Sequence, residues 1–66
     1  MEIEDIGKKI KELREEQGLT IRELADKTGV IYVNISKLEN GKYNAGIPIL
    51  NKLLDALDAE LKIEKR

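Results

Sequence analysis

Residues 19–41, which read LTIRELADKTGVIYVNISKLENG, carry the strongest signal for the fold of this chain. Thr20 and Glu23 have the spacing of a capping box, in which the threonine hydroxyl accepts a hydrogen bond from a first-turn amide and the glutamate reaches back. Gly29 can adopt the left-handed conformation that ends a helix near Thr28 and turns the chain. A short helix followed by a tight glycine turn is therefore predicted.

The second half of this stretch has features of both a strand and a helix. Residues 30–35 have the β-branched character that is typical of strands. Val30, Ile35 and Leu38 also form one face of a helix, and the Asn40-Gly41 pair is a common helix stop. Because the segment is short and its neighbours are helical, a helix is the preferred interpretation.

The segment before this stretch continues the helical pattern. Apolar residues recur at three- and four-residue steps from Ile3 to Leu13, with charged residues between them. This spacing predicts a helix over about residues 6–17, and Gly18 is suited to end it.

The segment after it predicts one more helix and a tail. Pro48 suits the first turn of a helix, where its missing amide costs nothing, and the apolar spacing ends near residues 57–58. Residues 59–64 alternate between apolar and polar, which is typical of a short strand. The predicted fold class is all-α, a compact bundle of four or five helices, with a short C-terminal β-strand as an additional element.

Composition excludes several classes of function. The chain has 66 residues, 41% of them apolar and 38% charged, which suits one small folded domain over residues 1–66. It has no cysteine and no histidine, so disulfides, thiolate metal sites and histidine general-base chemistry are excluded. Its carboxylates are spread over helix surfaces, so no enzymatic activity, no metal and no cofactor is predicted. No apolar run reaches transmembrane length and the N-terminus is acidic, so a cytoplasmic protein without a membrane contact is predicted.

The distribution of charge is more informative than its sum. The net charge of −1 does not favour nucleic-acid binding, because phosphate contacts need lysine and arginine. Residues 31–44, however, carry Lys37 and Lys42 against a single acid, Glu39. The middle of the chain is therefore its least acidic part.

The ordered set of residues resembles the Cro/C1-type helix-turn-helix family, also called the Xre family. The matching features are Leu-Thr before the second helix, Glu-Leu-Ala within it, Lys-Thr-Gly-Val at the turn, and Ile-Ser-Lys-Leu-Glu-Asn-Gly at the end of the third. The resemblance extends from about residue 6 to residue 57 and implies a lambda-repressor-like fold. It also implies sequence-specific binding of double-stranded DNA by a transcriptional regulator, most often a repressor, with the third helix in the major groove.

The resemblance also implies site residues. The residues at base-contacting positions are Tyr32, Val33, Ser36 and Lys37. The residues at phosphate- and sugar-contacting positions are Thr20, Ile21, Asn34, Asn40, Lys42 and Tyr43. Lys37 can donate to guanine acceptors, and Val33 can contact a thymine methyl group. Arg14 and Glu39 match a structural pair that joins the first helix to the end of the third.

The sequence departs from the family pattern at its predicted DNA surface. The family commonly has glutamine at the positions of Ile21 and Tyr32, and Ser, Thr or Asp at the position of Ile31. Losing that helix cap is expected to cost about 1 kcal/mol. Together with Val33 these residues form an apolar surface that either contacts thymine-rich DNA or binds another protein.

Two kinds of assembly follow from the tail and the apolar surface. Leu61 and Ile63 in the tail either cover the helical core or take part in a homodimer in which residues 59–66 pair across a two-fold axis. The homodimer is the preferred interpretation, because a short strand with an apolar face favours pairing. The predicted dimer interface comprises Leu54, Leu57, Leu61 and Ile63. The alternative is an antitoxin-like module that binds a partner toxin and represses its own operon.

Overall fold

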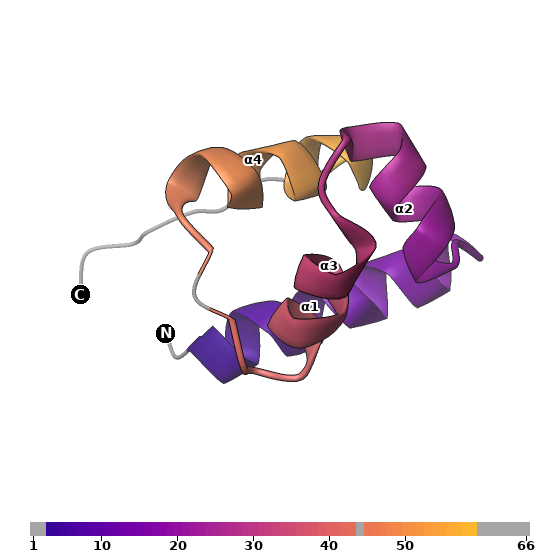
Figure 1. Cartoon of the computed structure of the whole chain (residues 1–66). Coiled ribbons are helices and arrows are strands. Elements are labelled where there is room, and N and C mark those ends of the chain that lie inside the picture. The colour runs from indigo at the N-terminus through magenta and orange to yellow at the C-terminus, as the bar shows by residue number, and fades with distance from the viewer. Residues whose placement is uncertain (1–2, 44, 60–66) are drawn as a thin grey trace.

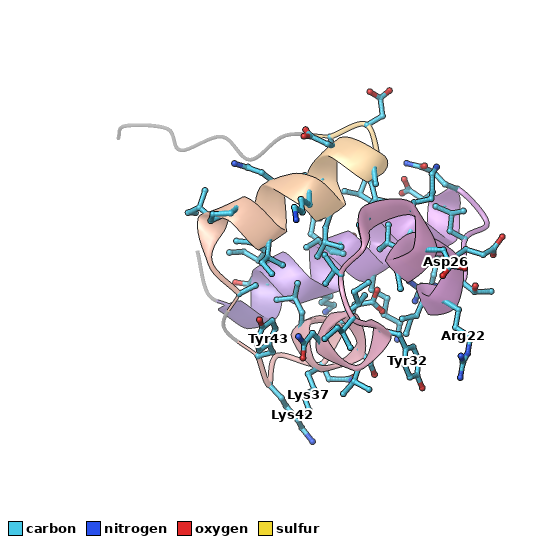
Figure 2. The ribbon with its side chains drawn as sticks, turned by 45° about the horizontal axis from the view of Figure 1, so that its top comes forward. Arg22, Asp26, Tyr32, Lys37, Lys42 and Tyr43 are labelled. Atoms are coloured by element: carbon cyan, nitrogen blue, oxygen red, sulfur yellow. The ribbon has the colours of Figure 1, made fainter. Side chains whose placement is uncertain are left out.

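Four helices form the part of the chain that the structure describes. The computed structural model describes residues 3–43 and 45–59. Their helices are α1 (Ile3–Glu16), α2 (Ile21–Thr28), α3 (Tyr32–Glu39) and α4 (Ile47–Ala56). α4 lies across the bundle from α1, with α2 at one end (Figure 1), and a second view shows α3 on the side opposite α4 (Figure 2). The all-α prediction is confirmed, while the predicted tail strand lies, except for Ala59, outside the described residues.

The first helix begins earlier than the sequence pattern predicted. α1 starts at Ile3 rather than near residue 6, and it ends at Glu16 as expected. Asp5 lies in the first turn, where a carboxylate interacts favourably with the positive end of the helix dipole. The observed start of α1 coincides with Ile3, the first residue of the apolar stripe.

The second helix has the cap that the sequence predicted. The Thr20 hydroxyl oxygen accepts from the Glu23 amide at 3.1 Å, and the Thr20 amide donates to Glu23 Oε1 at 2.9 Å. These bonds, chiefly the one from the Thr20 backbone, lower the pKa of Glu23. The carboxylate form is favoured in the folded chain, so this stabilisation is present at neutral pH and is lost as pH falls through the lowered pKa. Gly29 ends the helix at φ 76°, with its amide donating to the Ala25 carbonyl at 2.8 Å.

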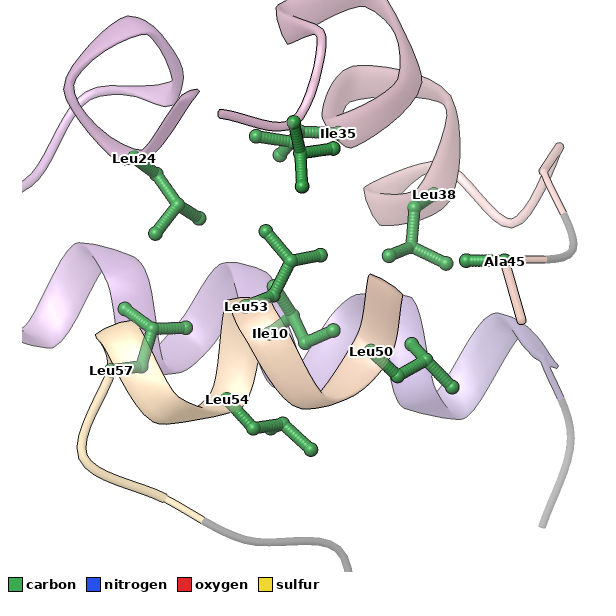
Figure 3. Close-up of a cluster of buried hydrophobic side chains, with 10 residues drawn as sticks. Ile10, Leu24, Ile35, Leu38, Ala45, Leu50, Leu53, Leu54 and Leu57 are labelled. Carbon is green, nitrogen blue, oxygen red and sulfur yellow. The ribbon is translucent and has the colours of Figure 1, made fainter. Parts of the chain in front are cut away.

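One aliphatic core holds the helices together (Figure 3). Its buried residues are Ile10, Leu24, Val30, Ile35, Leu38, Ala45, Leu50, Leu53, Leu54 and Leu57. Of the predicted helical face of Val30, Ile35 and Leu38, the last two lie on α3 and are buried in this core, whereas Val30 is buried but precedes the helix, which begins at Tyr32. The Gln17 side-chain amide donates to the Leu57 carbonyl at 2.7 Å, so the end of α1 is also joined to the end of α4.

A glycine allows α1 and α3 to approach each other closely. A Cβ atom placed on Gly7 would lie 1.8 Å from the Leu38 carbonyl oxygen and 3.2 Å from the Glu39 Cα. The two backbones are therefore in direct contact, and no side chain fits between them. This contact fixes the depth at which the C-terminal end of α3 sits on α1, and the sequence pattern did not predict it.

Two further kinds of feature do not occur in the described ranges. None of the helices there combines the length and the apolar character that crossing a bilayer requires. Among the same residues, no three potential metal-ligating side chains gather at one place.

Candidate nucleic-acid interface

The outer face of α3 carries the predicted base-contacting residues. Ile35 and Leu38 hold the inner face, because both are buried in the core. Tyr32, Val33, Ser36 and Lys37 share the opposite face, since residues three and four positions apart are neighbours on a helix. Tyr32 is 41% exposed and Val33 45% exposed, Ser36 is half-buried and Lys37 is exposed. The structure thus brings these four side chains to one accessible surface.

The end of α3 places Lys42 beside Lys37. The Lys42 amide donates to the Lys37 carbonyl at 2.8 Å, and the Gly41 amide donates to the Leu38 carbonyl at 3.0 Å. This pair of bonds is a Schellman motif, and Gly41 supplies the required left-handed conformation with φ 72°. Both lysine side chains project to the same side of the molecule (Figure 2). Two cations therefore lie at the C-terminal end of the exposed face.

Arg14 and Glu39 form a buried ion pair beneath this face. Arg14 Nε donates to Glu39 Oε2 at 2.8 Å and Nη2 donates to Oε1 at 2.9 Å, while Nη1 donates to the Leu19 carbonyl at 2.7 Å. Arg14 is 8% exposed and Glu39 is 9% exposed. The hydrogen bonds to Glu39 raise the pKa of Arg14 and outweigh burial, which lowers it. The pair joins α1 to α3, as the resemblance implied, and it neutralises Glu39, the acid that shares residues 31–44 with the two lysines.

Arg22 adds a cation that the sequence analysis did not assign to the site. Its guanidinium lies 4.7 Å from the centre of the Tyr32 ring, within the range of a cation–π contact. Arg22 comes from α2 and Tyr32 from α3, and both point to the side that carries Lys37, whereas Asp26 lies on the flank of α2 (Figure 2). The exposed face of α3 therefore has positive charge at both ends.

Comparison with known proteins agrees with this geometry. A family model described as helix-turn-helix matches residues 10–63. The chain belongs to the Cro/C1-type helix-turn-helix family. In the nomenclature of this family, α2 and α3 are the two helices of the helix-turn-helix motif. Gly29 lies in the turn between them, and α3 is the recognition helix.

Two relatives have names that describe regulators. The chain is 41% identical over 56 residues to the HTH-type transcriptional repressor RghR of Bacillus subtilis strain 168. The aligned region covers 83% of this chain and 42% of the repressor. It also matches the crystal structure of the clp gene regulator ClgR from Corynebacterium glutamicum, with a TM-score of 0.83 and 32% identity over 86% of this chain and 61% of that one. The chain thus spans less than two thirds of either protein. Neither name refers to a toxin, so the antitoxin alternative gains no support.

The side chains at the predicted phosphate-contacting positions of this helix-turn-helix domain differ in their exposure and in their hydrogen bonds within the chain. Thr20 is exposed, and Ile21 is half-buried against the core; both line a shallow, open hollow of about 560 Å³ at the start of α2. Asn34 is half-buried on α3. The Asn40 side-chain amide is engaged with the Ser36 carbonyl at 2.9 Å. Tyr43 packs partly against the core, whereas Lys42 is exposed. A ligand can therefore contact more of the Lys42 side chain than of the Tyr43 side chain.

The predicted dimer residues fall in two groups. Leu54 is 8% exposed and Leu57 is 1% exposed, and both belong to the core of the helix-turn-helix domain itself. Little of their surface is left for a second copy. Leu61 and Ile63 lie outside the described residues. The dimer interface therefore stays a prediction.

The recognition helix lacks the cap that the family usually has. Ile31 occupies the N-cap position of α3, its side chain makes no cap hydrogen bond, and it is 67% exposed. Replacing Ile31 by serine is expected to raise the free energy of unfolding by about 1 kcal/mol, because the hydroxyl can accept from a first-turn amide. Urea unfolding followed by circular dichroism measures the change. Ile31→Ala is the matched control, and equal stability of the two variants would contradict the expectation.

Proposed function

We propose that this chain binds double-stranded DNA sequence-specifically and regulates transcription as a repressor, with α3 in the major groove. The observation that carries the proposal is the exposed outer face of α3, flanked by cations, in a chain of the Cro/C1-type helix-turn-helix family. The name of the repressor relative supports the direction of regulation. Such a protein acts where duplex DNA is accessible, and we place it in the cytoplasm.

The proposed mechanism separates positioning from recognition. Phosphate contacts position a protein on the duplex, and contacts to base edges select the sequence. Arg22 and Lys42 flank the face (Figure 2), and in this mechanism they contact phosphates on either side of the groove. Lys37 is the residue suited to donate to the O6 and N7 acceptors of guanine, and the Ser36 hydroxyl can bond to either a donor or an acceptor. The buried pairing of Glu39 keeps its charge from opposing these contacts.

We further propose that the domain acts as a homodimer. A core of this size gives modest stability, and two copies would contact two half-sites about one helical turn apart, which is about 34 Å along B-DNA. Leu54 and Leu57 are buried in the core, so they have little surface for a second copy. Of the predicted interface residues, Leu61 and Ile63 are therefore proposed to form the contact between the two copies. Enrichment of an inverted repeat, together with a dimer mass in sedimentation equilibrium, would support this assembly.

The experiment that tests DNA recognition is selection from a randomised pool of duplexes. The native chain is expected to enrich one defined sequence. Lys37→Ala is expected to weaken binding to that sequence by about 5- to 150-fold and to relax the preference at one base pair, because a good base contact is worth about 1–3 kcal/mol. Fluorescence anisotropy with the enriched duplex measures the affinity of each variant.

Two lysine variants control for the loss of charge. Lys52 is exposed on α4, and α4 lies on the side of the molecule opposite α3 (Figure 2), so Lys52→Ala should leave both affinity and preference unchanged. Lys42→Ala should weaken all sequences alike and reduce the slope of log affinity against log salt by about one. Absence of any enriched sequence at low salt, or equal effects of Lys37→Ala and Lys52→Ala, would refute the proposed recognition surface.

A further inference from the structure

The first turn of α3 exposes a small apolar patch. Ile31, Tyr32 and Val33 are 67%, 41% and 45% exposed, although each has a large apolar side chain. The apolar character is unusual at a surface that the proposed function places against DNA. Resting on that function, we propose that Val33 recognises the 5-methyl group of a thymine that lies one or two base pairs from the base contacted by Lys37.

The charges around the patch favour DNA over an apolar protein partner. Arg22 stacks on Tyr32 at one end, and Lys37 and Lys42 lie at the other. The acid within the same stretch of chain, Glu39, is buried in its pair with Arg14. A narrow apolar strip between cations matches the major groove, where base edges lie between two lines of phosphates.

The chemistry of Val33 selects one base edge among four. In the major groove only thymine presents a methyl group, whereas adenine, guanine and cytosine present hydrogen-bonding atoms. Val33 has no side-chain donor or acceptor, so a polar edge placed against it would lose its water without gaining a partner. Contact with a thymine therefore gains apolar burial and avoids this loss, so Val33 determines specificity through both effects.

The helix geometry fixes where this thymine lies. Val33 is three residues before Ser36 and four before Lys37, so the three side chains are neighbours on one face. Four residues span about 6 Å along an α-helix, and successive base pairs are about 3.4 Å apart. The thymine methyl is thus within one or two base-pair steps of the guanine that Lys37 is suited to contact.

The test removes only the methyl group from the DNA. Each thymine of the enriched duplex is replaced singly by deoxyuridine, and the affinity of the full chain is measured by fluorescence anisotropy. At one position within two base pairs of the Lys37-dependent base pair, the native chain is expected to bind the uracil duplex about fourfold more weakly, which corresponds to about 0.8 kcal/mol for one buried methyl-sized group. For Val33→Ala the thymine and uracil duplexes should bind equally well. For Lys37→Ala the methyl effect should persist.

Each outcome distinguishes this inference from the proposed function. Because Val33 is half-exposed, Val33→Ala is expected to remain folded, which circular dichroism checks before binding is measured. If the native chain enriches a sequence but tolerates uracil at every position, or if Val33→Ala retains the full methyl effect, the inference is wrong and the proposed function stands. If the native chain enriches no sequence, the proposed function fails and the inference fails with it.

Discussion

Gly7→Ala is expected to destabilise this chain by about 3 kcal/mol or more. The new Cβ would lie 1.8 Å from the Leu38 carbonyl oxygen and 2.8 Å from the Leu38 carbonyl carbon, so α1 and α3 must separate. The Leu38 carbonyl cannot move freely, because it accepts the Gly41 amide at 3.0 Å in the cap of α3. A chain of 66 residues has a total stability of roughly 3–10 kcal/mol, so this single methyl group removes a large part of it.

The helix propensity of alanine works in the opposite direction. Glycine inside a helix is less favourable than alanine by about 1 kcal/mol, so a helix without a neighbour would be stabilised by this change. At Gly7 the clash with a fixed backbone is the larger effect, and the sign of the total is destabilising. Thermal and urea unfolding of the purified variant measure the result.

A second glycine provides the matched control for the clash. A Cβ on Gly46 would meet only the Pro48 Cδ, at 3.6 Å, which is ordinary van der Waals contact. The φ of Gly46 is −71°, which alanine adopts without strain. Gly46→Ala is therefore expected to change the free energy of unfolding by less than about 1 kcal/mol. A Gly7→Ala variant as stable as Gly46→Ala would show that the two helices are not in backbone contact.

Local signals in the sequence predicted the helix boundaries closely, except for the start of α1. The bounds of α2 could be predicted because the Thr20–Glu23 capping box and the Gly29 turn act within a few residues of the helix they delimit. The ambiguous segment 30–35 is helical from Tyr32 onward, because Ile35 and Leu38 are buried together against α1 and α4 (Figure 3), whereas Val30 and Ile31 precede the helix. That burial outweighs the strand propensity of the β-branched residues, as tertiary packing commonly does.

Contacts between helices could not be predicted from the same signals. The role of Gly7 depends on where α3 crosses α1, and the Arg22–Tyr32 stack depends on how α2 faces α3. Neither residue has a distinctive spacing along the chain. The Arg14–Glu39 pair spans 25 positions, and only the resemblance to a known family suggested it. The outer face of α3, by contrast, was predictable once Ile35 and Leu38 were assigned to the core, because helical periodicity then fixes the opposite face.

Glu39→Ala is expected to cost about 3–5 kcal/mol of stability, because it leaves the Arg14 guanidinium buried with only one of its acceptors. The native pair has two short hydrogen bonds in a bidentate arrangement, and it is the loss of one partner, rather than of the pair, that is costly. Urea unfolding measures the loss. An exposed acid such as Glu12, which forms only a surface pair with Lys9, should give less than about 1 kcal/mol when changed to alanine.

The double variant Arg14→Met/Glu39→Leu separates the structural role of the pair from any direct role in DNA binding. Removing both charges together leaves no unpaired ion, so we expect most of the stability lost in Glu39→Ala to return, apart from the bond to the Leu19 carbonyl. The pair has no net charge and lies beneath the recognition surface, so the double variant should bind the enriched duplex within about threefold of the native affinity. A large loss of affinity in a double variant that is stably folded would mean that Arg14 or Glu39 contacts DNA directly, because the replacement preserves both the net charge and the packing volume at this site.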